Sequence, residues 1–251
     1  MQLIKLLVII LGLVLSCSAQ NPTVISTGSI SVDNGIIIGR GGGTQNNNVV
    51  VGQNALTQNT TGNYNTAVGV AALSNNVSGI DNTAFGADAL KVNISSYNTA
   101  FGVAALYSLV NGNSNTAVGR AALQLSVDGV YNTAIGYAAL QSQTTGSSNT
   151  ALGRVACGLN QAGSNLVCLG HGAGRYEMGS NAIYIDALDR GSTTADKAGA
   201  IVYGTFNLNP IVQTLQFNAK LYAPYLSAGV GDFVCFDTTT SQIVRSAVSC
   251  R

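Results

Sequence analysis

The sequence predicts an all-β fold, a parallel β-roll (β-solenoid) with about 17 residues in each coil. The first observation is a nine-residue motif, Asn65 to Leu73 (NTAVGVAAL), which returns throughout the middle of the chain. The second is the period, since every step between repeat glycines is 17 residues except one of 16. The third is the polar, turn-type linker between motifs. Aligned on the repeat glycine, the copies lie at Gly52, Gly69, Gly86, Gly102, Gly119, Gly136, Gly153 and Gly170.

Composition excludes several classes of protein. Charged residues make up 8% of the 251 residues and the formal net charge is +1, so no basic patch for nucleic acid can be assembled. The hydrophobic fraction of 46% and the strict period argue against disorder. With one histidine and no CxxC motif, the chain is expected to hold neither zinc nor another metal or cofactor.

Residues just before the repeat glycine alternate between two faces of a predicted strand. The large apolar file (such as Val68) and the threonine file (such as Thr66) are expected to face the inside of the coil. The small residue between them then faces outward, where only a small side chain lets another backbone approach closely. We therefore predict a homotrimer whose chains meet through Ala67, Ala84, Ala100, Ala117, Ala134, Ala151 and Cys168.

The second half of each coil carries a leucine file four residues after the glycine, as at Leu73 and Leu106. We expect these leucines to meet the Val/Phe file from the opposite wall of a flattened coil. A helix of four or five residues would be marginal, so a strand is the preferred interpretation. The asparagines that begin the motif, such as Asn65 and Asn82, are expected to form a ladder of stacked amides.

The N-terminus has the pattern of a secretory signal peptide, residues 1–19. Lys5 supplies the positive charge, an apolar run follows, and small residues at Cys17 and Ala19 fit cleavage before Gln20. The apolar run is too short to span a membrane, and no other stretch of the mature chain is expected to span one. Lipidation of Cys17 is an alternative. We thus expect a secreted or cell-surface protein.

The remaining chain is predicted to divide into four parts. Residues 20–34 form an extended segment, 35–186 the β-roll, 187–233 a β-rich connector and 234–251 a hairpin. The first coil is expected to begin near Ile36. A disulfide between Cys235 and Cys250 would close the hairpin, whereas Cys157 and Cys168 are expected to be buried thiols.

Two motif copies, Asn165 to Gly170 and Asn181 to Asp186, resemble the Asn-Ser-Val-Ala-Ile-Gly head repeats of trimeric autotransporter adhesins, the YadA-like head. The longer NTAVGxAAL form is similar to repeats of phage tail-fibre proteins. The segment from Val234 to Cys250 resembles what precedes a self-cleaving intramolecular chaperone in such fibres. The resemblance implies a left-handed β-roll, three chains about one axis, attachment as the function and, for a tail fibre, a virion-associated location. It implies no catalytic residue, and no coiled-coil stalk or barrel anchor follows the repeats.

Several residues are candidates for contact with an external ligand, such as a host-surface protein or glycan. One outward column directly follows the repeat glycines and comprises Arg120, Tyr137, Arg154 and His171. A solvated column with no ligand is the simpler interpretation. The sequons at Asn59, Asn76 and Asn93 are interpreted as turn residues rather than glycosylation sites.

The function expected is therefore that of an exported trimeric fibre head that mediates attachment, and not that of an enzyme. A purely structural fibre or virion component without a receptor is the alternative. Straight threonine files are also the layout of ice-binding solenoids. Because Thr66 and its equivalents are expected to be buried beside the Val/Phe file, ice binding is the less favoured function.

Overall fold

The computed structural model describes residues 23–24, 30–32, 36–39, 47–207, 213–218, 233–237 and 242–246. The chain forms two units, Met1–Asn218 and Ala219–Arg251. In the described part of the second unit, β15 (Phe233–Asp237) and β16 (Gln242–Ser246) pair antiparallel as a hairpin. Cys250 and the predicted signal peptide lie outside the described residues, so the Cys235–Cys250 disulfide and the export signal stay predictions.

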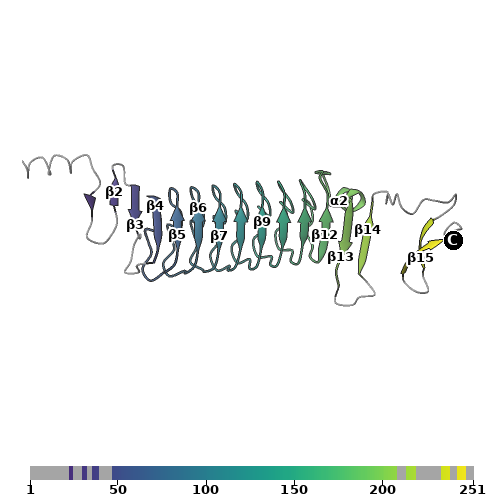
Figure 1. Ribbon diagram of the computed structural model, residues 1–251, viewed down its shortest axis with the longest axis horizontal. Helices are drawn as coiled ribbons and strands as arrows, with labels where there is room; N and C mark the ends of the chain where they lie inside the picture. The colour runs from purple at the N-terminus through teal and green to yellow at the C-terminus, as the bar shows by residue number, and fades with distance from the viewer. Residues whose placement is uncertain are drawn as a thin grey trace, which may run out of the picture. The chain divides into compact units, whose positions relative to one another are not determined.

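The first unit contains the predicted parallel β-solenoid, with about eight turns of about 17 residues. Figure 1 shows its short strands lying side by side, each joined to the next by a loop. Equivalent residues pair across neighbouring strands, for example Thr66 with Thr83 and Ala67 with Ala84. The strands are β4 (Val49–Gln53), β5 (Thr66–Val68), β6 (Thr83–Phe85), β7 (Thr99–Phe101), β8 (Thr116–Val118), β9 (Thr133–Ile135), β10 (Thr150–Leu152), β11 (Val167–Leu169) and β12 (Ala182–Ile185).

The strand direction reverses at both ends of this stack. At the N-terminal end, β3 (Ile36–Gly39) pairs antiparallel with β4, and β1 (Thr23–Val24) and β2 (Ile30–Val32) continue as antiparallel strands. The parallel coils therefore begin with β4, and the expectation that Ile36 opens the first coil is wrong. At the other end, β13 (Val202–Thr205) and β14 (Thr214–Phe217) are antiparallel, after the helix α2 (Thr193–Gly199).

The two faces of the sheet are the reverse of the prediction. The alanine file is fully buried inside a single chain, with Ala67, Ala100 and Ala134 all 0% exposed. The Thr and Val/Phe files point outward from the coil, and Phe101 is 52% exposed. The reason is volume, because the leucine file fills most of the thin interior and leaves room only for alanine opposite it. The trimer-contact role predicted for Ala67, Ala84, Ala100, Ala117, Ala134, Ala151 and Cys168 is thus wrong, since these side chains do not reach the surface.

The leucine side of the coil is made of turns, not of the strand that we expected. Leu73, Leu90 and Leu106 are buried as predicted, but each has a left-handed backbone with φ of 50–51°. The residue two positions earlier is also left-handed, as at Ala71 and Ala104 with φ of 55°. Alternating left- and right-handed residues curl the chain tightly, and their N–H groups donate to the neighbouring coil, as from Leu73 to the carbonyl of Ala89.

The repeat glycine is required by its surroundings. Gly102 has a φ of +140°, and a Cβ built on it would lie 2.5 Å from the carbonyl oxygen of Gly119 in the next coil. The same close approach recurs along the column, for example between Gly119 and Gly136. The period of the glycine therefore marks a place where the backbones of successive coils approach too closely for a side chain.

The motif asparagines form a buried ladder, although it differs in detail from the predicted stack of amides. The side-chain oxygen of Asn65 accepts from the backbone N–H of Asn82 at 3.0 Å. Its Nδ2 donates to the carbonyl of Gly79 at 2.8 Å. The ladder thus satisfies mainly backbone groups, which stabilises the corner between linker and strand.

The single 16-residue step does not disturb the sheet, because the missing residue falls in the linker between Asn93 and Asn98. Ser95 takes the place of the linker glycine found in other coils, and its carbonyl accepts from Asn93 Nδ2 at 2.9 Å. Thr83 and Thr99 still pair in register. A change of length is absorbed at this corner of the coil.

Candidate functional surfaces

One regular surface of the solenoid is the outer side of its parallel sheet, which we call the sheet face. It carries two parallel files, the threonines of the motif and the large apolar residues two positions later. Phe85 and Phe101 stack on one another with ring centroids 4.7 Å apart and planes inclined by 8°. The apolar file continues through Val51, Val68, Phe85, Phe101, Val118, Ile135, Leu152 and Leu169, and four of these side chains are 38–52% exposed.

An apolar file of this length, with every member at least partly exposed, is unusual on a monomeric protein. The threonine file beside it is also partly or fully exposed, as at Thr83 and Thr150. The expectation that the threonines are buried is therefore wrong, for the same reason as the alanine assignment. The strands of the sheet face pair in register without an insertion, and Figure 1 shows them running in nearly the same direction along the stack, so the face has little twist.

The predicted ligand column is brought together by the fold. We call the residues directly after the repeat glycines the C-edge file, because they border the C-terminal ends of the strands. The guanidinium groups of Arg120 and Arg154 each lie 5.8 Å from the ring centre of Tyr137. Nη1 of Arg154 lies 3.0 Å from Nε2 of His171. These four side chains are exposed and form one stacked row over four coils.

A second exposed row, not identified from the sequence, borders the other ends of the strands. We call it the N-edge file; its members precede the repeat glycine, or Asp186 in the last copy, by five residues, and all have φ between 54° and 63°. Tyr64, Tyr97 and Tyr131 are the most exposed aromatic residues of the described coils, at 57–65%. The signal that reveals the row is a tyrosine before the motif asparagine in every second coil. The full file is Tyr64, Asp81, Tyr97, Ser114, Tyr131, Ser148, Asn165 and Asn181.

The three sequon asparagines point into the coil. Asn59, Asn76 and Asn93 are at most 2% exposed. Nδ2 of Asn76 donates to the carbonyl of Gly79 at 3.0 Å, which closes the turn. These burials agree with the interpretation of turn residues, because a glycan cannot be carried by a buried amide.

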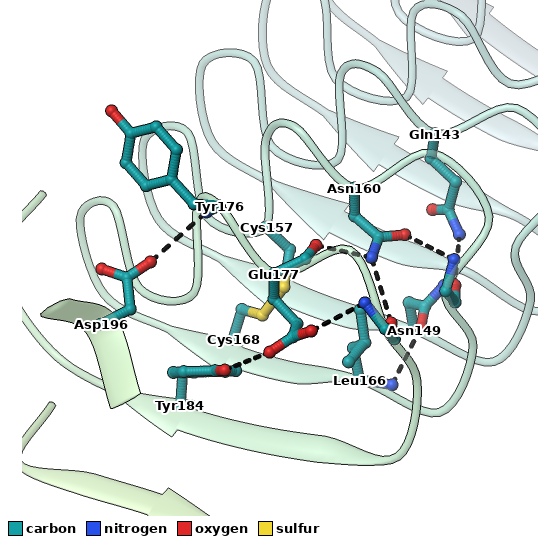
Figure 2. The surroundings of a disulfide bond; sticks show 12 residues. Gln143, Asn149, Cys157, Asn160, Leu166, Cys168, Tyr176, Glu177, Tyr184 and Asp196 are labelled. Atoms are coloured by element: carbon teal, nitrogen blue, oxygen red, sulfur yellow. Dashed lines mark hydrogen bonds between the residues drawn. A yellow bond between two sulfur atoms is a disulfide. The ribbon is translucent and has the colours of Figure 1, made fainter. Parts of the chain in front are cut away.

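The cysteine prediction is wrong for the first pair. Cys157 and Cys168 form a disulfide, and both are fully buried (Figure 2). Cys157 occupies the leucine file of one coil and Cys168 the alanine file of the next strand. Because these two files face one another across the interior, the substitution of both by cysteine places the sulfurs in contact.

The C-terminal end of the solenoid holds a buried polar cluster, also shown in Figure 2. The hydroxyl of Tyr184, a residue that is 0% exposed, donates to the carboxylate of Glu177. The backbone N–H of Gly179 donates to the other oxygen of Glu177 at 2.7 Å, and Nζ of Lys197 lies 3.2 Å from the carboxylate. Burial acts to raise the pKa of Glu177, but the hydrogen bonds from Tyr184 and Gly179 and the charge of Lys197 outweigh it and lower that pKa.

Asp196 of α2 lies at the same end and is 1% exposed. Its Oδ2 accepts from the backbone N–H of Tyr176 at 3.4 Å. Burial raises the pKa of Asp196, and the nearby carboxylates of Asp189 and Asp186 raise it further. The cluster covers the end of the last coil, and its groups are directed mostly at one another and at backbone atoms, although Oδ1 of Asp196 is buried without a hydrogen-bond partner.

Other site types are sparsely represented in the part of the chain that the structure describes. A surface depression of about 430 Å³ is lined by Asn165, Asn181, Phe206 and Asn207. Within the described ranges, no group of three or more His, Cys, Asp or Glu side chains is placed to hold a metal ion. Among the same residues, no helix has the length and apolar character needed to cross a membrane.

The chain was also compared with known proteins. No protein-family model, curated protein or solved structure matches it.

Proposed function

We propose that this protein is the repeat block of an exported, homotrimeric fibre head, in which three copies associate through the sheet face and the assembly mediates attachment to a surface. The observation that carries the proposal is the apolar file of the sheet face, which runs over eight coils from Val51 to Leu169 with four side chains exposed and four partly exposed. Exposed apolar surface of this extent favours association, because burying it releases about 25 cal/mol for each Å².

Three copies around an axis parallel to the solenoid would bring three flat faces together and bury the Thr and Val/Phe files. The sheet face thus takes the role in trimer contact that the sequence analysis gave to the alanine file. Export is supported by the buried Cys157–Cys168 disulfide, since disulfides persist in oxidising compartments. The signal-like N-terminus supports it as well.

Assembly is tested by replacing Phe101 with Asp. Phe101 is already half exposed in one chain, so the charge costs the isolated coil little, whereas three carboxylates would meet near the trimer axis. We expect sedimentation to show trimers for the native chain and monomers for the variant. The matched control is Leu125→Asp, which places the same charge on an equally exposed residue outside the sheet face. A monomeric native chain would refute the proposal.

Attachment is tested separately with the native trimer. We expect it to bind to cells or to members of a glycan array, and we expect the Phe101→Asp monomer to bind more weakly because it has lost multivalency. A trimer that binds none of these surfaces would instead support the purely structural fibre.

Ice binding is a second candidate, which the exposure of the threonine file favours. Hydroxyl and methyl groups recur once in each coil, about 4.8 Å apart along a flat surface. The face cannot be used both for ice and for a trimer. A monomer that shows thermal hysteresis, lost on replacing Thr99 and Thr116 by Lys, would establish this function and exclude the first.

A further inference from the structure

The two edge files of the sheet face match one another coil by coil. Where the N-edge file has tyrosine, the C-edge file has an apolar or aromatic residue: the pairs are Tyr64 with Val70, Tyr97 with Val103, and Tyr131 with Tyr137. Where the N-edge file has a small polar residue, the C-edge file has alanine, arginine or histidine: Asp81 with Ala87, Ser114 with Arg120, Ser148 with Arg154, and Asn165 with His171.

This match has no explanation within one chain. Tyr97 precedes β7 by two residues and Val103 follows it by two, so the strand separates them. The three residues of β7 alone add about 10 Å between them. The two side chains are therefore at opposite edges of the same sheet and do not touch.

The tyrosines are also poorly suited to their local backbone. Tyr64, Tyr97 and Tyr131 have φ of 57–63°, a region that costs a bulky residue about 1–2 kcal/mol. Asp81 and Asn165 show which residue types this turn favours. Each tyrosine is nevertheless more than half exposed, so packing within the chain does not offset the strain.

Three-fold symmetry brings the two edges together. If copies are related by rotation about an axis parallel to the solenoid, all strands run around that axis in the same sense. The C-terminal ends of one copy's strands then point at the N-terminal ends of the next copy's strands. Rotation without translation keeps equivalent coils level, and the contact repeats until the ring closes.

We infer that the N-edge file of each copy packs against the C-edge file of its neighbour, level by level, to form a seam between chains. The inference rests on the proposed trimer and adds to it which edges meet and in which register. In this seam, Tyr97 of one copy packs on Val103 of the neighbouring copy. Arg120 and Arg154 of that neighbour extend over Ser114 and Ser148, which are small residues of the first copy. The stacked row of Arg120, Tyr137 and Arg154 is then one side of the seam rather than a ligand site.

Cysteine pairs test the seam in the full chain. A disulfide needs Cα atoms about 4.4–6.8 Å apart, so it reports register sharply. We expect Tyr97→Cys/Val103→Cys, after mild oxidation, to run as a covalent trimer on a non-reducing denaturing gel. The matched controls shift one member by a coil, as Tyr97→Cys/Ala87→Cys and Tyr97→Cys/Arg120→Cys, and should give much less cross-linking. The single variants measure the background from the native cysteines.

The outcomes separate the seam from the trimer. A chain that sediments as a trimer while the level pair fails to cross-link overturns the seam and leaves the proposed assembly standing. Preferential cross-linking of a shifted pair overturns the level register. A monomer refutes both proposals.

A charge pair gives a second readout. Ser148→Glu would place a carboxylate beside the neighbour's Arg154-equivalent position and should raise the trimer's melting temperature at low salt, whereas Ser148→Lys should lower it. The Arg154→Ala background should abolish this difference. Equal melting temperatures for the two Ser148 variants would overturn the seam. The seam would also be overturned if the Arg120→Ala/Arg154→Ala trimer kept its native stability but lost binding to cells, and this result would assign the row to a ligand.

Discussion

The repeat glycines and the alanines two positions after them both have positive φ, but only the alanine position has space for a Cβ. Gly102 has a φ of +140° and no space for a Cβ beside Gly119. Ala104 has a φ of 55° and carries a Cβ that its backbone disfavours. Replacing the glycine by alanine therefore measures the cost of adding a side chain, and replacing the alanine by glycine measures the cost of added backbone freedom.

We predict that Gly102→Ala lowers the free energy of unfolding by at least about 2 kcal/mol, because it combines backbone strain with contact against a carbonyl. Ala104→Gly should change it by less than about 1 kcal/mol, since relief of strain offsets the entropy of glycine. Urea unfolding followed by circular dichroism measures both. Equal effects of the two variants would contradict the assigned backbone geometry.

The error in the alanine file shows what residue patterns can and cannot determine. The alternation in Thr66-Ala67-Val68 separates two faces correctly, but both faces are apolar enough to be buried. Which one is inside depends on the volume left by Leu73 and its equivalents, a quantity set by the whole cross-section of the coil. For the same reason the sequence does not predict the contact of Cys157 with Cys168, which depends on the leucine and alanine files facing one another.

Among the elements, α2 is distinguished by the buried carboxylate that it brings to the end of the stack. Ser192 caps the helix, its side chain accepting from the N–H of Ala195 at 3.2 Å. The helix was not expected from the sequence, because its seven residues lie in a connector that was predicted to be β-rich. The strands on either side of it lie where the sequence indicates β-structure, β12 in the motif copy Asn181 to Asp186 and β13 in the connector 187–233.

We predict that Asp196→Asn gains stability relative to the native chain as the pH rises. Burial raises the pKa of Asp196 in the folded state above the unfolded value of about 3.9, so the native protein binds a proton that the unfolded chain does not. The native chain therefore loses stability as the pH rises from the unfolded pKa of Asp196 through its folded pKa. The variant has no titrating group at this position and does not lose this stability.

Melting temperatures of the two chains between about pH 3 and pH 7 measure this difference. Glu177, whose pKa is lowered, contributes equally to both chains and cancels. A difference that shrinks as the pH rises would contradict the expected burial of Asp196.

At the scale of the whole molecule, each coil contacts only the coils before and after it. Such a stack unfolds from its ends, and its stability is close to a sum of terms for each coil and each interface. The Cys157–Cys168 disulfide lies near the C-terminal end and closes a short loop, with a sequence separation of 11. It ties the last coils together where fraying would otherwise begin.

We predict that reduction of this disulfide costs about 3 kcal/mol, the value that chain entropy gives for a loop of this size. The variant Cys157→Leu/Cys168→Ala restores the residues found in the other coils, and buried leucine offsets part of the loss. Hydrogen exchange of the last coils should quicken when reductant is added to the native chain and stay constant in the variant. If the native chain is unaffected, the disulfide does not limit fraying.

The reversal of strand direction at β3 and β13 fixes the length of the parallel stack. A further coil of the same kind cannot dock on either end, because the adjoining strands β3 and β13 run antiparallel to the stack. Length can therefore change only within the gene, by gain or loss of a 17-residue unit, and in steps of about 4.8 Å. Natural or engineered relatives that differ by whole units would differ in reach while keeping both ends and every lateral surface unchanged.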